Sequence, residues 1–148
     1  MSDRYVRDWR PEDAAAFANF PVEPTSVPLP AWTALVHEEP VACAGLWIVR
    51  PKLGEAWAIF RQPIVHGVWI AREMRRRIDG MLANGGFRRI QMTVRLGAIR
   101  PERLAIFLGM QNEGCLRAYG DDGADHWMYG KTKPSKRRQR RGARGRWM

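Results

Sequence analysis

The most informative stretch of the chain is AIFLGMQNEGCLRAYGDDGADHWMYG, residues 105–130. It opens with the apolar end of a helix that stops at Gly109, since glycine commonly follows a last helical turn. Two strand-type runs follow, at 113–119 and 125–130, and Gly-Asp-Asp-Gly stands between them at 120–123. Because glycine and aspartate favour tight turns, this segment predicts a helix followed by a β-hairpin.

The rest of the order follows from hydrophobic period and turn residues. Residues 90–94 alternate apolar and polar side chains, and residues 70–82 carry apolar side chains at helical spacing. Strand-type runs lie at 5–7, 32–36, 41–49 and 55–60, a helix start lies at 10–17, and the proline-rich segment 21–30 predicts a loop. The predicted order is β-α-β-β-β-α-β-α-β-β, which indicates an α/β or α+β domain.

Charge divides the chain into two parts. The 148 residues hold 25 Lys and Arg against 15 Asp and Glu, a formal charge of +10. Nine of the basic residues and none of the acidic ones lie in 131–148, so residues 1–130 keep 16 basic against 15 acidic side chains. We therefore expect a folded domain over 1–130 and an arginine-rich extension over 131–148, disordered alone or held by a partner.

Several classes of protein are excluded. No apolar run approaches the roughly 18 residues that cross a bilayer, and the first residues do not resemble a secretory signal. Two cysteines, Cys43 and Cys115, make neither a disulfide framework nor a zinc site. His37, Glu38 and Glu39 have no second ligand cluster, so we expect no metal. We expect a cytoplasmic protein without membrane attachment.

The order of elements and the residues at their joints resemble the GNAT (GCN5-related N-acetyltransferase) superfamily. The closest correspondence is residues 105–114, AIFLGMQNEG, which resemble the family's last helix and its Leu-Gly-Phe corner, with Met110 for the usual Phe. Residues 115–130 resemble the closing hairpin of GNAT-like proteins encoded by bacteriophages. The resemblance covers residues 4–130 and implies a mixed central sheet flanked by helices.

The resemblance also implies a cofactor site. Family members bind acetyl-CoA at a splayed pair of parallel strands, here 55–60 and 90–94. The pyrophosphate meets backbone N–H groups where the following helix begins, because a helix N-terminus offers unpaired donors to an anion. The corresponding residues of this chain are His66, Gly67, Val68 and Arg72.

The chain departs from the family pattern at both chemical positions. The phosphate loop has Ile64 where Arg or Gln is usual and Trp69 where Gly or Ala is usual, and a tryptophan there is expected to crowd the backbone. The tyrosine that many members use as general acid is replaced by Ala105. These departures predict an acetyl-CoA motif that has eroded.

Two further side chains are catalytic candidates. Glu55, at the start of the strand 55–60, could serve as general base toward an amine, although strand-edge carboxylates usually face water. Tyr119 could serve as the acid if the closing hairpin folds over the site, and otherwise packs at a sheet edge.

The extension suits a polyanionic partner, because dense arginines contact phosphates and an aromatic side chain stacks on bases. Alternatives are an acidic protein surface or a solubility tail. The binding candidates are Lys136, Arg137, Arg138, Arg140, Arg141, Arg144, Arg146 and Trp147.

Two functional hypotheses follow. The first is a phage-encoded GNAT-like protein, associated with a virion or an assembly, that binds nucleic acid or phage structural proteins through its extension, as a monomer or an oligomer. The alternative is an active acetyl-CoA-dependent N-acetyltransferase that modifies an amine of a protein or a small molecule.

Overall fold

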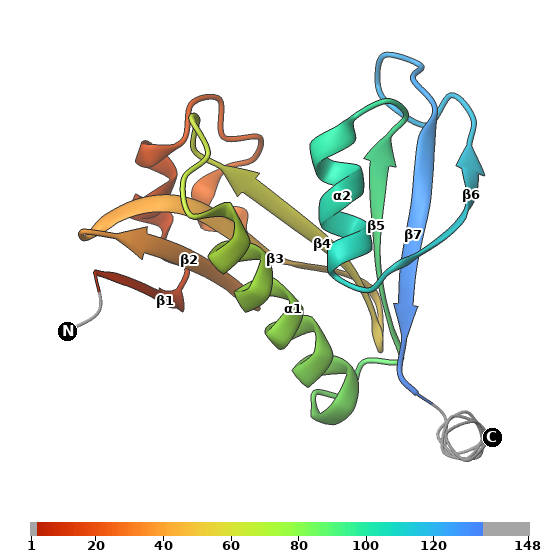
Figure 1. Cartoon of the computed structure of the whole chain (residues 1–148), viewed down its shortest axis with the longest axis horizontal. Helices are drawn as coiled ribbons and strands as arrows, with labels where there is room; N and C mark the ends of the chain where they lie inside the picture. The colour runs from red at the N-terminus through yellow and green to blue at the C-terminus, as the bar shows by residue number, and fades with distance from the viewer. Residues whose placement is uncertain (1–2, 135–148) are drawn as a thin grey trace.

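A computed structural model describes residues 3–134 of the chain. Its elements follow the predicted order (Figure 1). They are β1 (Arg4–Asp8), the 3₁₀ helices η1 (Pro11–Ala16) and η2 (Pro24–Ser26), β2 (Ala31–Val36), β3 (Glu39–Arg50), β4 (Leu53–Phe60), α1 (Gly67–Asn84), β5 (Arg89–Arg95), α2 (Ile99–Phe107), β6 (Gln111–Leu116) and β7 (His126–Thr132). Neither α1 nor α2, the α-helices within residues 3–134, is long and apolar enough to cross a membrane.

The seven strands form one mixed sheet in the order β1-β2-β3-β4-β5-β7-β6. Every neighbouring pair is antiparallel except β4 and β5, which are parallel and are connected through α1. Helices α1 and α2 lie over the same face of the sheet (Figure 1). The mixed sheet with flanking helices that the sequence predicted is therefore confirmed.

The main core lies between the sheet and α1. The helix buries Ile70, Met74, Ile78 and Leu82, the stripe predicted from helical spacing. These side chains pack on the strands together with buried residues of α2 such as Ala105. A second, smaller core lies on the opposite face, where Trp9 and Phe17 pack near Cys43.

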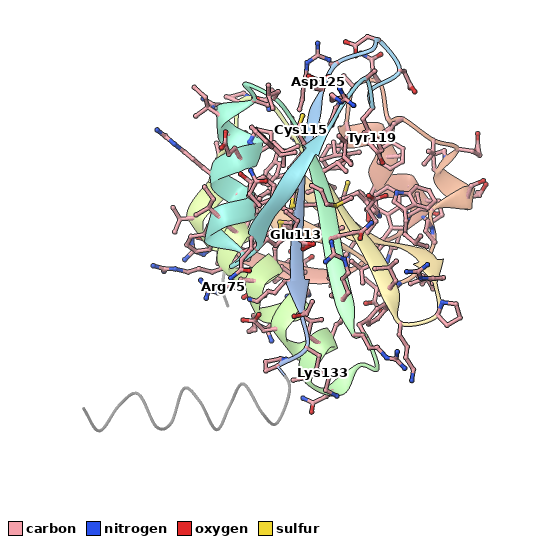
Figure 2. The ribbon with its side chains drawn as sticks, turned by 90° about the vertical axis from the view of Figure 1, so that its right-hand side faces the viewer. Arg75, Glu113, Cys115, Tyr119, Asp125 and Lys133 are labelled. Carbon is pink, nitrogen blue, oxygen red and sulfur yellow. The ribbon has the colours of Figure 1, made fainter. Side chains whose placement is uncertain are left out.

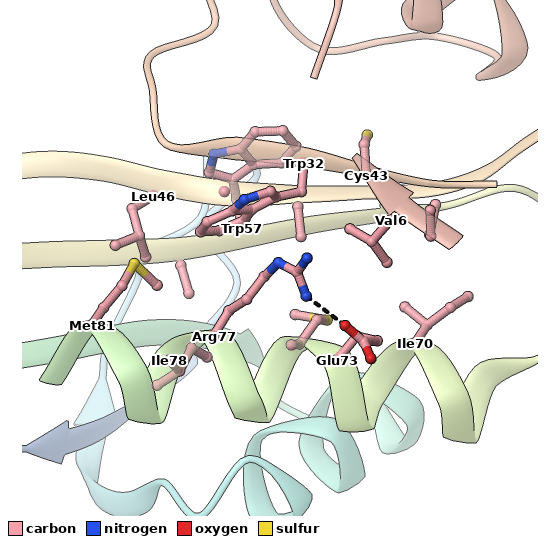
Figure 3. Close-up of a pocket in the computed structure, with 16 residues that line it drawn as sticks. Val6, Trp32, Cys43, Leu46, Trp57, Ile70, Glu73, Arg77, Ile78 and Met81 are labelled. Atoms are coloured by element: carbon pink, nitrogen blue, oxygen red, sulfur yellow. Dashed lines mark hydrogen bonds and ion pairs between the residues drawn. The ribbon is translucent and has the colours of Figure 1, made fainter. Parts of the chain in front are cut away.

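A pocket lies between α1 and the sheet, and charged side chains as well as apolar ones line it. Arg77 projects from α1 toward the strands, where its guanidinium lies 5.4 Å from the ring centroid of Trp32 and pairs with Glu73 (Figure 3). Small side chains, among them Ala34 and Ala44, line the sheet side of this pocket. The small strand residues thus leave room beneath α1 for an ion pair.

The predicted helix at 10–17 is a 3₁₀ helix instead. Its Asp13 is buried and accepts hydrogen bonds from the Arg7 guanidinium at 2.8 Å, from Thr33 Oγ1 at 2.6 Å and from the Arg10 amide at 2.9 Å. These bonds tie the segment to β1 and β2, and the backbone continues extended at Phe17.

Strand β7 runs to Thr132 and includes two residues of the segment expected as an extension. The Lys131 ammonium donates to the carbonyl oxygen of Leu108 at 2.9 Å and pairs with Asp79 of α1. This lysine is therefore part of the folded domain. Residues 135–148, which include the predicted binding side chains at 136–147, lie outside the described residues.

Candidate cofactor site and neighbouring pocket

The parallel ladder between β4 and β5 is short. It consists of Leu53 with Arg89, Gly54 with Ile90, and Glu55 with Gln91. Beyond Glu55, β4 follows β3 as far as Phe60, whereas β5 stays paired with β7 along its whole length. The two strands consequently spread apart toward their carboxyl ends (Figure 1), as the family resemblance implied for this pair.

The first turn of α1 lies after the diverging end of β4. His66, the residue before the helix, has φ 55° in the left-handed region and provides no side-chain cap. The amide of Ile70 donates to the carbonyl oxygen of His66 at 3.0 Å, so the N–H groups of Gly67, Val68 and Trp69 have no partner within the helix. Such donors, aligned with the helix dipole, suit an anion.

Arg4 of β1 brings a cation to this helix start. Its guanidinium carbon lies 5.2 Å from the ring centroid of Trp69, and its Nη1 lies 3.4 Å from His66 Nδ1. The Trp69 indole therefore lies against Arg4 of β1, and the expectation that a tryptophan here crowds the phosphate approach stays a prediction. Sequence reasoning missed Arg4 because 62 residues separate it from His66 and no local pattern links them.

The residues at this helix start fit a diphosphate. A Cβ added to Gly67 would meet only the Ile64 side chain, at 3.4 Å, so Ile64 packs beside the turn. Val68 is exposed at the second helical position, and Arg72 is exposed one turn further along α1. The backbone donors of this turn can thus contact an anion, with Ile64 in place of the family's polar side chain, and Arg4 and Arg72 lie within one turn of these donors along β1 and α1.

The two catalytic candidates, Glu55 and Tyr119, lie at different positions along the direction of the strands. Glu55 is half-buried in the last pair of the parallel ladder, on the face opposite α1. Tyr119 is half-exposed in the connection from β6 to β7, where its ring lies against His126 at 5.3 Å, beside the end of β5 (Figure 2). Glu55 pairs with Gln91 of β5, and His126 pairs with Arg95 of the same strand. These two positions on β5 are four residues, or about 13 Å, apart.

The position at which the family has its proton donor is buried and holds no acidic group in this chain. Ala105 of α2 has no exposed surface and carries no titratable group. Tyr129, which reaches α2 from β7, is buried and donates to Glu102 Oε1 at 3.3 Å. Burial and the Glu102 carboxylate raise the pKa of Tyr129, so its proton is held tightly.

An apolar pocket of about 200 Å³, open to solvent, lies on the same face as Glu55. Because side chains alternate along β4, Glu55, Trp57 and Ile59 share this face. Segment 20–27 covers it from the other side, with Phe20 and Val22 among the lining residues. The pocket can therefore receive an apolar group on the face of the sheet that carries Glu55, whose strand partner Trp47 is one of the lining residues.

Within residues 3–134, no group of three or more His, Cys, Asp or Glu side chains is placed to hold a metal ion. Cys43 is buried and Cys115 is exposed, and both are free thiols. The groups that the candidate site offers are backbone amides, arginines and the Glu55 carboxylate.

Solved structures that superpose on this chain include acetyltransferases. A GNAT-family acetyltransferase from Bacillus anthracis superposes with a TM-score of 0.72 at 11% identity, over 89% of this chain and 96% of that chain. The ribosomal-protein-S5-alanine acetyltransferase of Vibrio fischeri also gives 0.72, at 14% identity, over 91% and 96% of the two chains.

A ribosomal L7/L12 alpha-N-protein acetyltransferase in complex with coenzyme A gives 0.63 at 14% identity. It aligns with 69% of this chain, which spans 60% of its length. Neither a protein-family model nor a curated protein sequence matches the chain. The diverging β4–β5 pair, the helix that follows it and these superpositions together show that this protein has the fold of the GNAT acetyltransferases.

Proposed function

We propose that this protein binds a coenzyme A thioester beside the diverging strands β4 and β5 but lacks the means to transfer its acyl group efficiently. The observation that carries the proposal is the contrast between two helices. The first turn of α1 offers three free amides to a diphosphate, whereas α2 has the buried Ala105 at the proton-donor position.

Each part of the site has a role in this proposal. The amides of Gly67, Val68 and Trp69 would bind the pyrophosphate, and Arg4 and Arg72 would add positive charge around it. Acetyl-CoA would supply an activated acyl group with a thiolate as leaving group. A departing thiolate needs a proton, and Ala105 has none to give.

We further propose that the protein acts through a polyanionic partner. The arginine-rich extension supports nucleic acid or a neighbouring protein as that partner, since residues 131–148 contain nine basic and no acidic side chains. The proposed place of action is a bacteriophage particle, or the host cytoplasm during its assembly, on the ground of the sequence resemblance noted for residues 115–130 alone.

The second candidate is an active N-acetyltransferase, and the apolar pocket on the Glu55 face of the sheet favours it. The Glu55 carboxylate could take a proton from an amine whose apolar neighbour lies against Trp57. Two of the similar structures are described as acetyltransferases of ribosomal proteins, one of them on an alpha-amino group. The acceptor would then be a protein N-terminus with an apolar side chain.

Thiol release from acetyl-CoA separates the two candidates. Full-length protein is incubated with acetyl-CoA and an N-terminal peptide that begins with an apolar residue, and free thiol and acetylated peptide are measured together. The binding proposal expects no more of either product than in protein-free buffer. Peptide acetylation that depends on protein and is lost in Glu55→Gln would establish the enzyme instead.

A further inference from the structure

Four cations gather where the strands β4 and β5 begin, at the opposite end from their divergence. The Arg88 amide donates to the carbonyl oxygen of Lys52 at 2.9 Å, and the Lys133 amide donates to that of Arg88 at 2.8 Å. Arg50 belongs to the same hairpin as Lys52, because it pairs with Leu53. We name Arg50, Lys52, Arg88 and Lys133 the cationic end.

The charges of the cationic end are not neutralised within the described residues 3–134. All four side chains are exposed, and none of them forms an ion pair or a side-chain hydrogen bond there. Two other cations at this end differ, because Arg89 pairs with Glu113 and Lys131 pairs with Asp79. Like charges on neighbouring strands repel one another, so this cluster lowers the stability of the fold.

The cationic end is distant from the candidate cofactor site. Lys133 lies at one end of β7, whereas Tyr119 and Asp125 lie around the other end (Figure 2). The chain leaves the sheet at Lys133, and the sequence that follows contains the remaining seven basic residues of the extension. The most basic segment of the chain thus begins next to the cationic end of the domain.

We propose that the cationic end binds the sugar–phosphate backbone of a nucleic acid. Side chains on neighbouring strands stand about 4.8 Å apart, a spacing at which flexible lysine and arginine side chains can reach successive phosphates. Contacts to phosphates carry no sequence information, so the binding is independent of base sequence. This inference rests on the polyanionic partner proposed above and assigns it a surface on the folded domain.

The test measures binding of full-length protein to labelled single strands of about 20 nucleotides by fluorescence anisotropy, from about 50 to 200 mM salt. Probes of DNA and of RNA are used in parallel. The variant K52Q/R88Q/K133Q removes three charges from the cationic end. The matched control R100Q/R103Q/R117Q removes three exposed charges from α2 and from the segment after β6, at the other end of the sheet.

The variant K52Q/R88Q/K133Q should bind both probes about tenfold more weakly, and its slope of log K against log salt should be smaller by about 2, or 0.7 for each lost phosphate contact. The control should match the wild type within about twofold. Equal behaviour of the two variants would overturn the inference, and so would a loss confined to one kind of nucleic acid. Binding of poly-glutamate as tight as that of nucleic acid would overturn it in favour of an acidic protein.

Two further measurements distinguish a failure of this inference from a failure of the proposed function. If R137Q/R138Q/R140Q/R141Q loses nucleic-acid binding while K52Q/R88Q/K133Q keeps it, the extension is the partner site and the cationic end is not. If the wild type binds no nucleic acid, the proposed partner and the cationic end both fail. Coenzyme A titrations of the K52Q/R88Q/K133Q variant should match the wild type, because the cofactor site lies at the opposite end of the sheet.

Discussion

Glu55 of β4 and Gln91 of β5 are the last paired residues of the parallel ladder, and the two strands separate beyond them. A carboxylate therefore lies at the point of divergence, on the face that carries the apolar pocket. The first turn of α1, the proposed diphosphate site, begins beyond the far end of the same strand, β4. One strand thus connects the candidate cofactor site with the candidate acceptor site.

Val68 offers a test of the diphosphate site that does not depend on catalysis. Its side chain is 62% exposed in the first turn of α1. In Val68→Glu the new carboxylate repels a diphosphate while it favours the helix dipole, so coenzyme A should bind at least about tenfold more weakly without loss of stability. The matched Val68→Gln should keep wild-type affinity in calorimetric titration. Equal affinities of the two variants would place the diphosphate elsewhere.

Asp13 should be one of the most sensitive charged residues to substitution. Burial opposes its ionisation, but hydrogen bonds from Arg7, Thr33 and the Arg10 amide outweigh burial and lower the pKa of Asp13. Asp13→Asn leaves Arg7 without its carboxylate and should lower the free energy of unfolding by about 2–3 kcal/mol at pH 7. Urea unfolding measures this loss, and Asp121→Asn at an exposed site is the control.

The same substitution predicts a pH dependence. Because the pKa of Asp13 is lower in the folded than in the unfolded chain, its stabilisation is complete above the unfolded value, near 3.9, and is lost as the pH falls through the folded value. The stability difference between wild type and Asp13→Asn should therefore shrink as the pH falls below about 4. A difference that stays constant over this range would show that the carboxylate charge is not what stabilises the fold.

Two glycines should respond to alanine in opposite directions. A Cβ on Gly45 of β3 would lie 2.7 Å from the carbonyl oxygen of Pro30 and 2.9 Å from Ala31 Cβ, so Gly45→Ala should cost about 2–3 kcal/mol. Gly80 of α1 has no atom within 4 Å of such a Cβ, and Gly80→Ala should raise stability by about 0.5–1 kcal/mol. Thermal and urea unfolding measure both, and a stable Gly45→Ala would contradict the close packing of β2 and β3.

Arg77 and Arg76 share Glu73 as partner but differ in environment. The Arg77 side chain is largely buried under α1 and lies over Trp32, whereas Arg76 is 69% exposed. Arg77→Ala removes an ion pair, a cation–π contact and packed methylene groups, and should cost about 1–2 kcal/mol. Arg76→Ala should cost less than about 0.5 kcal/mol. Similar losses in both variants would show that the ion pair alone, and not the position under α1, determines the effect.

Local patterns were sufficient for the order of elements. The stripe from Ile70 to Leu82 and the alternation of Ile90, Met92 and Val94 report burial on one face, and both agree with the observed helix and strand. The glycines after Asn84 and after Leu108 mark the two helix ends, since they adopt or allow turn conformations. Such signals depend on neighbouring residues only.

Contacts between distant segments were not predictable in this way. No spacing rule places Arg4 against Trp69, and the bonds of Asp13 to Arg7 and Thr33, which accompany a 3₁₀ helix in place of an α-helix, join three elements. The position of Lys131 in β7 likewise depends on Asp79 and on the carbonyl oxygen of Leu108. The family resemblance therefore implied the diverging strands, but neither it nor any local pattern indicated the side chains that surround the helix start.

The most direct test of the account is a calorimetric titration of full-length protein with coenzyme A. The account predicts a single site with a dissociation constant of about 1–100 μM. Absence of binding at about 1 mM coenzyme A would contradict it. The uncapped first turn of α1 would then be a feature of the fold that binds no diphosphate.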